Sequence, residues 1–436
     1  MNRRLRLKRD DVRRLRRSPQ QRHVLVNVAG TMVGQGAVVV SGVLAARLLG
    51  VTDRGYLALF VIVGSVVLQI GTLGIPMSLA YYTARGYDAY SLLRELRPVF
   101  AGLALGLPLV AFAALLIGLQ GASGGALIAA LLSIMCIPFR MVVAVAVGTS
   151  QGLERYVGHN TLKLISPVLY SLALVIGALL FSRLNLLAVT GIWVATQVVA
   201  AGYASVLLAR SRSASSRTRL DPAASRRGLL AFGARGVLGG NSPLDAYRLD
   251  QAVVGFALSP YALGLYVSAA AFTNFPRLYV SAVGTVGYPR ISRGHGEARL
   301  PSIISWFLAV TMLGTIATII PLMIFADPLL PLFFGDAFRP GIPAMRVLLV
   351  AAFFACIRRA LSDVANGLGR PSWASQSELI SWIVLAIGAV TLAPLAGVVG
   401  VAWALAGSGA IGGAYLGLRV WVAVRALRMP TGSSAQ

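Results

Sequence analysis

Long apolar runs separated by short polar segments dominate the chain. A helix needs about 20 consecutive, mainly apolar residues to cross the hydrocarbon core of a bilayer. Runs of this kind cover residues 24–49, 56–83, 98–119, 126–149, 162–181, 186–209, 229–258, 261–288, 302–325, 343–367, 376–395 and 397–423. The pattern therefore predicts an all-α polytopic membrane protein with twelve transmembrane helices.

Basic residues fall unevenly between these runs. If the N-terminus is placed in the cytoplasm, most of the basic residues lie in cytoplasmic segments, and only Arg54, Arg183 and Arg339 lie in outer loops. Cytoplasmic loops of membrane proteins carry an excess of Lys and Arg. We therefore expect both termini in the cytoplasm of a multi-pass inner-membrane protein. The basic tail, residues 1–22, is expected to lie on anionic membrane lipids rather than on nucleic acid.

The polar segment 210–228 divides the runs into two sets of six. We expect a basic tail (1–22), an N-terminal six-helix lobe (23–209), a cytoplasmic linker (210–228), a C-terminal six-helix lobe (229–424) and a cytoplasmic tail (425–436). Short motifs recur in the two halves: Gln151–Arg155 and Asn366–Arg370 each end a fourth run, and Gly55-Tyr56 and Gly264-Leu265-Tyr266 each follow an outer turn. Six is an even number, so the lobes form a parallel repeat with the substrate in a central cavity.

The amino-acid composition limits the classes of function that the protein can have. Apolar residues make up 57% of the chain and charged residues 12%, with a net charge of +25. Soluble domains have about 25% charged residues, so soluble enzymes and nucleic-acid binders are excluded. No catalytic constellation, nucleotide-binding motif or metal-ligand spacing is present, and we expect a transporter without a cofactor. Any energy it uses would come from a proton or sodium gradient or from the substrate's own distribution across the membrane.

Charged residues within the runs are the candidate functional groups, because a charge in the bilayer centre costs roughly 2.5–3.5 kcal/mol and usually faces a cavity or a partner. The strongest candidates for anion binding are Arg140, Arg248, Arg277 and Arg358. Asp245, Asp250, Arg359 and Asp363 are candidates for coupling or for structural ion pairs.

The spacing of these charges suggests how they pair. Arg359 and Asp363 are four residues apart and can pair on one helix, which would leave Arg358 as the unpaired cation. Arg248 and Asp250 are two apart, so each is expected to pair with groups on other helices. Asp245 could carry an ion or cap a helix. Glu378 is expected at the membrane interface, and Tyr81, Tyr82, Tyr261 and Tyr266 in aromatic belts.

Helix-breaking residues accompany the buried charges. Gly239, Gly240 and Pro243 interrupt the seventh run, and Pro276 precedes Arg277 in the eighth. The second run has a milder break at Gly71, Gly74 and Pro76. Irregular backbone is tolerated at membrane depth only where protein or a water-filled cavity satisfies it, so these breaks favour alternating access around an anionic substrate.

Motifs along nearly the whole chain resemble those of one family. They are AARLLG (45–50), DRGY (53–56), GIP (74–76), YY (81–82), QGL (151–153), YRLDQ (247–251), LGLY (263–266), FFGDAF (333–338) and NGLGRP (366–371). In order and spacing they resemble the Wzx-type polysaccharide flippases of the multidrug/oligosaccharidyl-lipid/polysaccharide exporter superfamily.

The resemblance implies two six-helix lobes around a V-shaped cavity lined by spans 1, 2, 7 and 8, with Asn27 and Gln35 as polar residues of span 1. It implies a flippase that moves a polyprenyl-pyrophosphate-linked oligosaccharide from the cytoplasmic to the outer leaflet. Expected partners are a polysaccharide polymerase and glycosyltransferases, and the protein is expected to be a monomer. Alternatives are a lipid II flippase, a drug/cation antiporter of the same superfamily, a membrane glycan polymerase or ligase, and a scaffold.

Overall fold

The computed structural model describes residues 19–119, 121–181, 184–211, 225–239, 248–293 and 299–428, and every regular element in these ranges is a helix. This confirms the expected all-helical fold. The chain packs into two compact units. Unit 1 comprises Met1–Leu44, Val67–Ala113 and Leu127–Leu238, and unit 2 comprises Ala45–Val66, Ala114–Ala126 and Gly239–Gln436.

The first half of the chain forms long and short helices within the described residues. They are α2 (Pro19–Gly71), α3 (Ile75–Ala84), α4 (Ala89–Gly118), α5 (Gly124–Met135), α6 (Ile137–Gly152), α7 (Tyr156–Leu180), α8 (Leu186–Arg210) and α9 (Arg226–Gly239). Within unit 1, α6 packs against α3, α7 and α8. The core between α3, α4 and α9 contains Ile75, Leu79, Leu92, Leu96 and Leu229, all fully buried.

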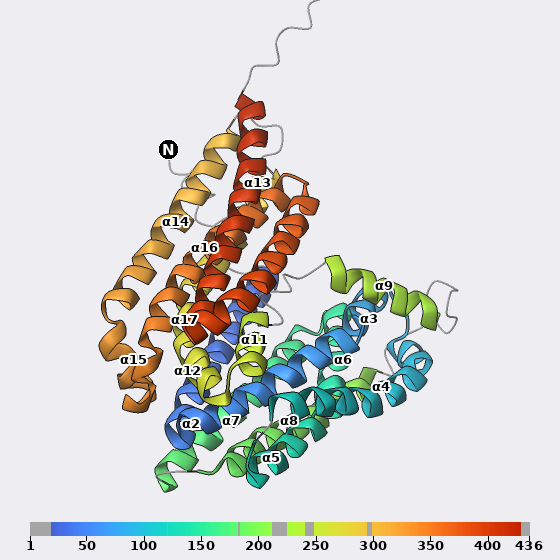
Figure 1. The fold of residues 1–436 in the computed structure, drawn as a ribbon. Helices are drawn as coiled ribbons and strands as arrows, with labels where there is room; N and C mark the ends of the chain where they lie inside the picture. Colours follow the sequence, from blue (N-terminus) through green and yellow to red (C-terminus); the bar gives the residue numbers. More distant parts are fainter. Residues whose placement is uncertain are drawn as a thin grey trace, which may run out of the picture. The chain divides into compact units, whose positions relative to one another are not determined.

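The second half repeats this alternation of long and short helices. Its elements are α11 (Leu249–Ala257), α12 (Pro260–Ala270), the 3₁₀ turn η3 (Ala271–Thr273), α13 (Asn274–Arg293), α14 (Leu300–Ile324), α15 (Ala326–Phe334), η4 (Asp336–Gly341), α16 (Ile342–Gly367) and α17 (Pro371–Arg428). Figure 1 shows α13, α14, α16 and α17 running alongside one another, and α16 packs against each of the other three.

Several of these helices can cross a membrane by length and composition. Among the described residues the stretches that qualify are Val51–Gly71, Ala89–Gly118, Gly124–Gly152, Tyr156–Leu180, Leu186–Arg210, Leu300–Ile324, Asp336–Gly367 and Pro371–Arg425. Val33–Leu49 is a shorter apolar helix. The chain is therefore a multi-pass membrane protein, as expected, while the count of twelve spans and the cytoplasmic placement of both termini remain predictions.

Glycines mark the points where long helices bend. Gly50 in α2 and Gly397 in α17 adopt φ values of 77° and 54°, and Gly74 before α3 has φ 68°. These left-handed conformations carry no steric cost for glycine, which lacks a Cβ. The predicted break of the second run at Gly74 is confirmed, and Gly397 bends α17 at the predicted boundary between the runs 376–395 and 397–423.

The other predicted breaks have different outcomes. The eighth run is interrupted by η3, and Pro276 lies in the first turn of α13. In the seventh run α9 ends at Gly239 and α11 begins at Leu249. Gly240, Pro243 and Asp245 fall on residues 240–247, which lie outside the described residues. The fourth run was predicted as one helix, but it divides at Cys136 into α5 and α6, because Pro138 cannot donate a backbone hydrogen bond and begins a new helix.

Two glycines of the recurring motifs make reciprocal backbone contacts in unit 2. A Cβ at Gly55 would collide with the backbone carbonyl of Pro260, and a Cβ at Gly264 would collide with that of Val51. Val51 precedes Pro260 by 209 residues, and Gly55 precedes Gly264 by the same 209. Two segments related by a two-fold axis produce such a mutual contact, in which each repeats the other's role.

Candidate functional site

Four polar side chains from α11, α12 and α13 gather in unit 2. We call Arg248, Asp250, Tyr266 and Arg277 the Asp250 cluster. The Tyr266 hydroxyl donates a hydrogen bond to Asp250 Oδ2 at 2.8 Å, and the tyrosine is fully buried. Both arginines interact electrostatically with the Asp250 carboxylate. The cluster thus places two guanidinium groups within electrostatic range of one carboxylate.

Local structure fixes where these side chains lie. Arg248 caps the start of α11 with φ 45° and ψ 52°, a left-handed conformation that costs a non-glycine residue about 1–2 kcal/mol. The Ser259 side chain accepts a hydrogen bond from the Ala262 amide at 3.1 Å and Pro260 occupies the first turn, so the start of α12 is well defined. Tyr266 follows on the same helix. Backbone strain of the kind found at Arg248 gathers at functional sites.

The cluster can recognise an anion. Guanidinium groups bind phosphate oxygens in a bidentate manner and stay charged when partly buried. Arg277 is half-buried at the start of α13, whereas Arg248 is exposed. Asp250 offsets one of the two positive charges, which leaves the four named side chains with a net charge of +1. Such a site favours an anionic ligand over a cationic one.

Tyr266 is the member that sequence reasoning missed. Its assignment to an aromatic belt is wrong, because its ring is buried and its hydroxyl is bonded to Asp250. The expectation that Asp250 pairs with a group on another helix is met by this hydrogen bond, although Arg248 beside it also interacts electrostatically with Asp250. The LGLY motif carried an indication that Tyr266 is buried, because Tyr266 follows the closely packed Gly264 by two residues.

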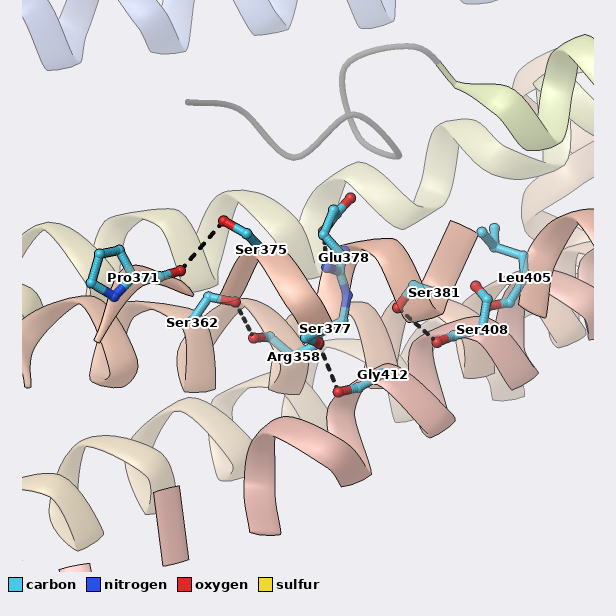
Figure 2. A network of polar contacts seen from close by, with 10 residues as sticks. All are labelled: Arg358, Ser362, Pro371, Ser375, Ser377, Glu378, Ser381, Leu405, Ser408 and Gly412. Carbon is cyan, nitrogen blue, oxygen red and sulfur yellow. Dashed lines mark hydrogen bonds and ion pairs between the residues drawn. The ribbon is translucent and has the colours of Figure 1, made fainter. Parts of the chain in front are cut away.

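Arg358 lies in a different environment. It is 4% exposed and its Nη1 donates to Glu378 Oε2, which joins α16 to α17 in a buried ion pair (Figure 2). The expectation that Arg358 is the unpaired cation is therefore wrong. Glu378 is 9% exposed and lies inside the protein, and its level in the membrane stays a prediction. The partner was missed because it lies 20 residues away on another helix, where only tertiary packing brings it close.

Next to this ion pair, serine side chains form hydrogen bonds between the two halves of α17. Ser377 Oγ donates to the Gly412 carbonyl at 2.7 Å, and Ser381 Oγ donates to the Ser408 carbonyl at 3.0 Å (Figure 2). Both serines are fully buried. The three interactions hold α16 and the two halves of α17 together, so Arg358 has a structural explanation in its observed position.

The remaining candidates are placed separately. Arg359 Nε lies 3.4 Å from Asp363 Oδ1, which confirms the predicted pair on one helix. Arg140, in unit 1, lies over the Trp193 ring with its guanidinium carbon 5.7 Å from the ring centroid. Gln35 is exposed on α2. Asn27 also belongs to α2, but its side chain lies outside the described part.

Arg47 connects two of the motifs that resemble those of the exporter family. Its Nε donates to the Phe333 carbonyl at 2.7 Å, and its Nη2 donates to the Leu332 carbonyl. These carbonyls end α15, where helical hydrogen bonds run out and a cation is favourable. The AARLLG and FFGDAF motifs therefore meet through a helix cap rather than through a binding site.

Comparison with known proteins places the chain among membrane exporters. A family model described as "Polysaccharide biosynthesis protein" matches residues 21–295. A probable low-salt glycan biosynthesis flippase, Agl15 of Haloferax volcanii, is 25% identical over 166 residues, 37% of this chain. The match spans only 35% of that relative's length.

Two solved structures share the fold. The lipid II flippase MurJ in an inward closed conformation has a TM-score of 0.72 at 16% identity, covering 93% of this chain and 90% of its own. An inward-facing multidrug resistance MATE family transporter of the MOP superfamily has a TM-score of 0.71 at 15% identity, covering 92% and 96%. These matched proteins are flippases and transporters, which agrees with the expectation of a transporter rather than an enzyme.

Proposed function

The chain belongs to the polysaccharide biosynthesis protein family, and from that premise we propose that it is a flippase for a polyprenyl-pyrophosphate-linked oligosaccharide. The lipid-linked glycan would move from the cytoplasmic to the outer leaflet by alternating access, for assembly of a cell-surface polysaccharide. A glycosyltransferase would supply the substrate and a polymerase would use the product.

The Asp250 cluster is the observation that carries this proposal. Its two guanidinium groups, Arg248 and Arg277, match the pyrophosphate, which is the one strongly anionic part of such a substrate. Asp250 interacts electrostatically with both arginines before substrate arrives. The substrate would compete with this carboxylate for the guanidinium groups, while Tyr266 continues to donate its hydrogen bond to Asp250.

Competition between the substrate and Asp250 for the two arginines would allow the substrate to change the conformation of the protein. A ligand shifts a conformational equilibrium only by the difference in its affinity for the two states. Release of the arginines from Asp250 would favour movement of α11 and α13, which begin at irregular backbone beside Arg248 and η3. The polyprenyl chain would remain among the lipids, where its apolar surface is already shielded from water.

A reconstituted flipping assay tests the function. Purified protein in liposomes should flip a fluorescent polyprenyl-pyrophosphate-linked oligosaccharide, measured as the fraction that an impermeant reductant can quench. Arg277→Gln should slow flipping at least tenfold. Arg346→Gln is the matched control, because Arg346 is an arginine of unit 2 that pairs with Asp327 at 2.6 Å outside the cluster.

The same assay separates the rivals. Absence of flipping by well-folded wild-type protein would contradict the flippase and favour a scaffold. Transport of a lipophilic cation instead of the pyrophosphate lipid would favour the drug/cation antiporter. Equal flipping by the Arg277→Gln and Arg346→Gln variants would keep the flippase but remove the Asp250 cluster from its mechanism.

A further inference from the structure

Unit 1 contains a mainly apolar groove that is also lined by two arginines. The groove has a volume of about 300 Å³ and lies between α4, α6 and α8. Its walls are apolar side chains such as Leu93, Phe100, Met141 and Leu208. Arg94, Arg97 and Tyr90 also line the groove, from the first turns of α4. We call this the α4 groove.

The two arginines of the α4 groove are available to a ligand. Arg94 and Arg97 are both exposed, and neither has an ion-pair partner within the described part of the chain. The acid between them in sequence, Glu95, is directed to α9, where Arg226 Nε lies 3.9 Å from Glu95 Oε1. The nearest carboxylate in sequence is thus held by another arginine.

Unit 2 contains a second groove of the same design. It has a volume of about 440 Å³ between α14, α16 and the last part of α17. Apolar side chains such as Ile304, Leu308 and Val420 form its walls, and Arg425 stands at its end. The Arg425 guanidinium carbon lies 5.3 Å from the centroid of the Trp421 ring, and the tryptophan is 56% exposed. We call this the α14 groove.

The two grooves occupy equivalent places in the two halves of the chain. In the order of the predicted runs, α4, α6 and α8 contain the third, fourth and sixth runs of the first half. The helices α14, α16 and the last part of α17 contain the third, fourth and sixth runs of the second half. Both grooves are formed by the start of a third helix and the end of a sixth, the ends that the basic residues assign to the cytoplasm.

We propose that each groove holds an anionic phospholipid of the inner leaflet, with an acyl chain along the apolar wall and the phosphate at the arginines. The inner leaflet is rich in anionic lipid, and each Lys or Arg near its surface contributes about 1 kcal/mol to lipid binding. Guanidinium groups at the end of an apolar channel match both parts of such a molecule. The aromatic residues Tyr90 and Trp421 suit the interfacial level of the headgroup.

A phospholipid fits these positions better than the transported substrate. Two such grooves are present, one in each unit, and duplicated sites suit lipids bound at the surface better than a single transported molecule. In unit 2 the α14 groove uses none of the helices that supply the Asp250 cluster, α11, α12 and α13. The inference therefore does not depend on the proposed function.

Native mass spectrometry tests the proposal directly. Purified protein titrated with phosphatidylglycerol should retain two tightly bound molecules, and phosphatidylcholine should bind at least about tenfold more weakly. The Arg94→Gln/Arg97→Gln variant should retain one phosphatidylglycerol, Arg425→Gln should also retain one, and the triple variant none. Arg370→Gln is the matched control, because Arg370 also stacks on a tryptophan, Trp373, but lines neither groove.

The outcomes that overturn the proposal are distinct. Two phosphatidylglycerol molecules on the triple variant, or equal retention of phosphatidylcholine, would show that the arginines do not select the lipid. Displacement of both by equimolar undecaprenyl pyrophosphate would identify the grooves as substrate sites instead. The charge-preserving variant Arg94→Lys/Arg97→Lys should keep the lipid, and loss from it despite an unchanged thermal melt would also contradict the proposal.

Discussion

Arg358 and Glu378 form an ion pair in which the side chains are only 5% and 12% exposed. Removing one partner of a buried pair leaves an uncompensated charge and costs roughly 3–5 kcal/mol, whereas replacing both by apolar residues can be neutral. The pair joins α16 to α17, so it should matter to the stability of unit 2.

We expect Glu378→Gln to lower the free energy of unfolding by several kcal/mol, measured by thermal or denaturant unfolding in detergent. The double variant Arg358→Met/Glu378→Leu should recover most of that loss. Arg339→Gln is the control: Arg339 pairs with Asp336 at 2.9 Å, but the side chains are 66% and 81% exposed, so its loss should be below about 1 kcal/mol. Similar losses for the buried and exposed pairs would contradict this account.

The close approach at Gly55 gives a second prediction. A Cβ there would collide with the Pro260 carbonyl, and overpacking of this kind costs about 1–3 kcal/mol. Gly55→Ala should therefore lower the unfolding temperature. Gly102→Ala on α4 is the control, because a Cβ there meets no atom within 4 Å, and it should leave stability unchanged or raised. An unchanged melt for Gly55→Ala would show that this backbone contact does not form.

The hydrogen bond from Tyr266 to Asp250 gives a third prediction. Tyr266→Phe leaves the half-buried Asp250 carboxylate without its donor, which should lower stability by about 1–3 kcal/mol and reduce transport several-fold. Tyr279→Phe is the control, because it loses a comparable bond of 2.9 Å to the Val310 carbonyl outside the cluster. It should reduce stability while transport by the folded fraction stays near wild type. Equal transport by the two variants would assign Tyr266 a purely structural role.

The helix cap at Arg47 gives a fourth prediction. Arg47→Gln removes donors to the Phe333 and Leu332 carbonyls, and unfolding should become easier by about 1–2 kcal/mol. Arg47→Lys should recover only part of this, because one ammonium cannot reproduce the forked geometry. Full recovery by Lys in the same unfolding measurement would mean that charge alone matters.

Local features were predictable from the sequence, and contacts between distant helices were not. The breaks at Gly74 and Gly397 and the Arg359–Asp363 pair follow from backbone freedom and helical periodicity within a few residues. The Arg358–Glu378 pair depends on how α16 packs against α17, which spacing along one helix cannot reveal.

The candidate site shows the same division. Sequence placed Arg248, Asp250 and Arg277 among the charges that need a partner, because they lie in apolar runs. It assigned Tyr266 to the membrane interface, since an amphipathic ring within a run fits both places. Only the packing of α12 beside α11 distinguishes the two positions.

Recognition of the pyrophosphate by the Asp250 cluster should be visible in the affinity of the protein for undecaprenyl pyrophosphate. Binding should be measured for wild-type protein and for the Arg277→Gln, Arg277→Lys and Arg346→Gln variants, each confirmed to be folded by its thermal melt. We expect Arg277→Gln to weaken binding at least tenfold, Arg277→Lys to weaken it less, and Arg346→Gln to leave it unchanged. Equal affinity in the wild-type protein and the Arg277→Gln variant would contradict recognition by the cluster.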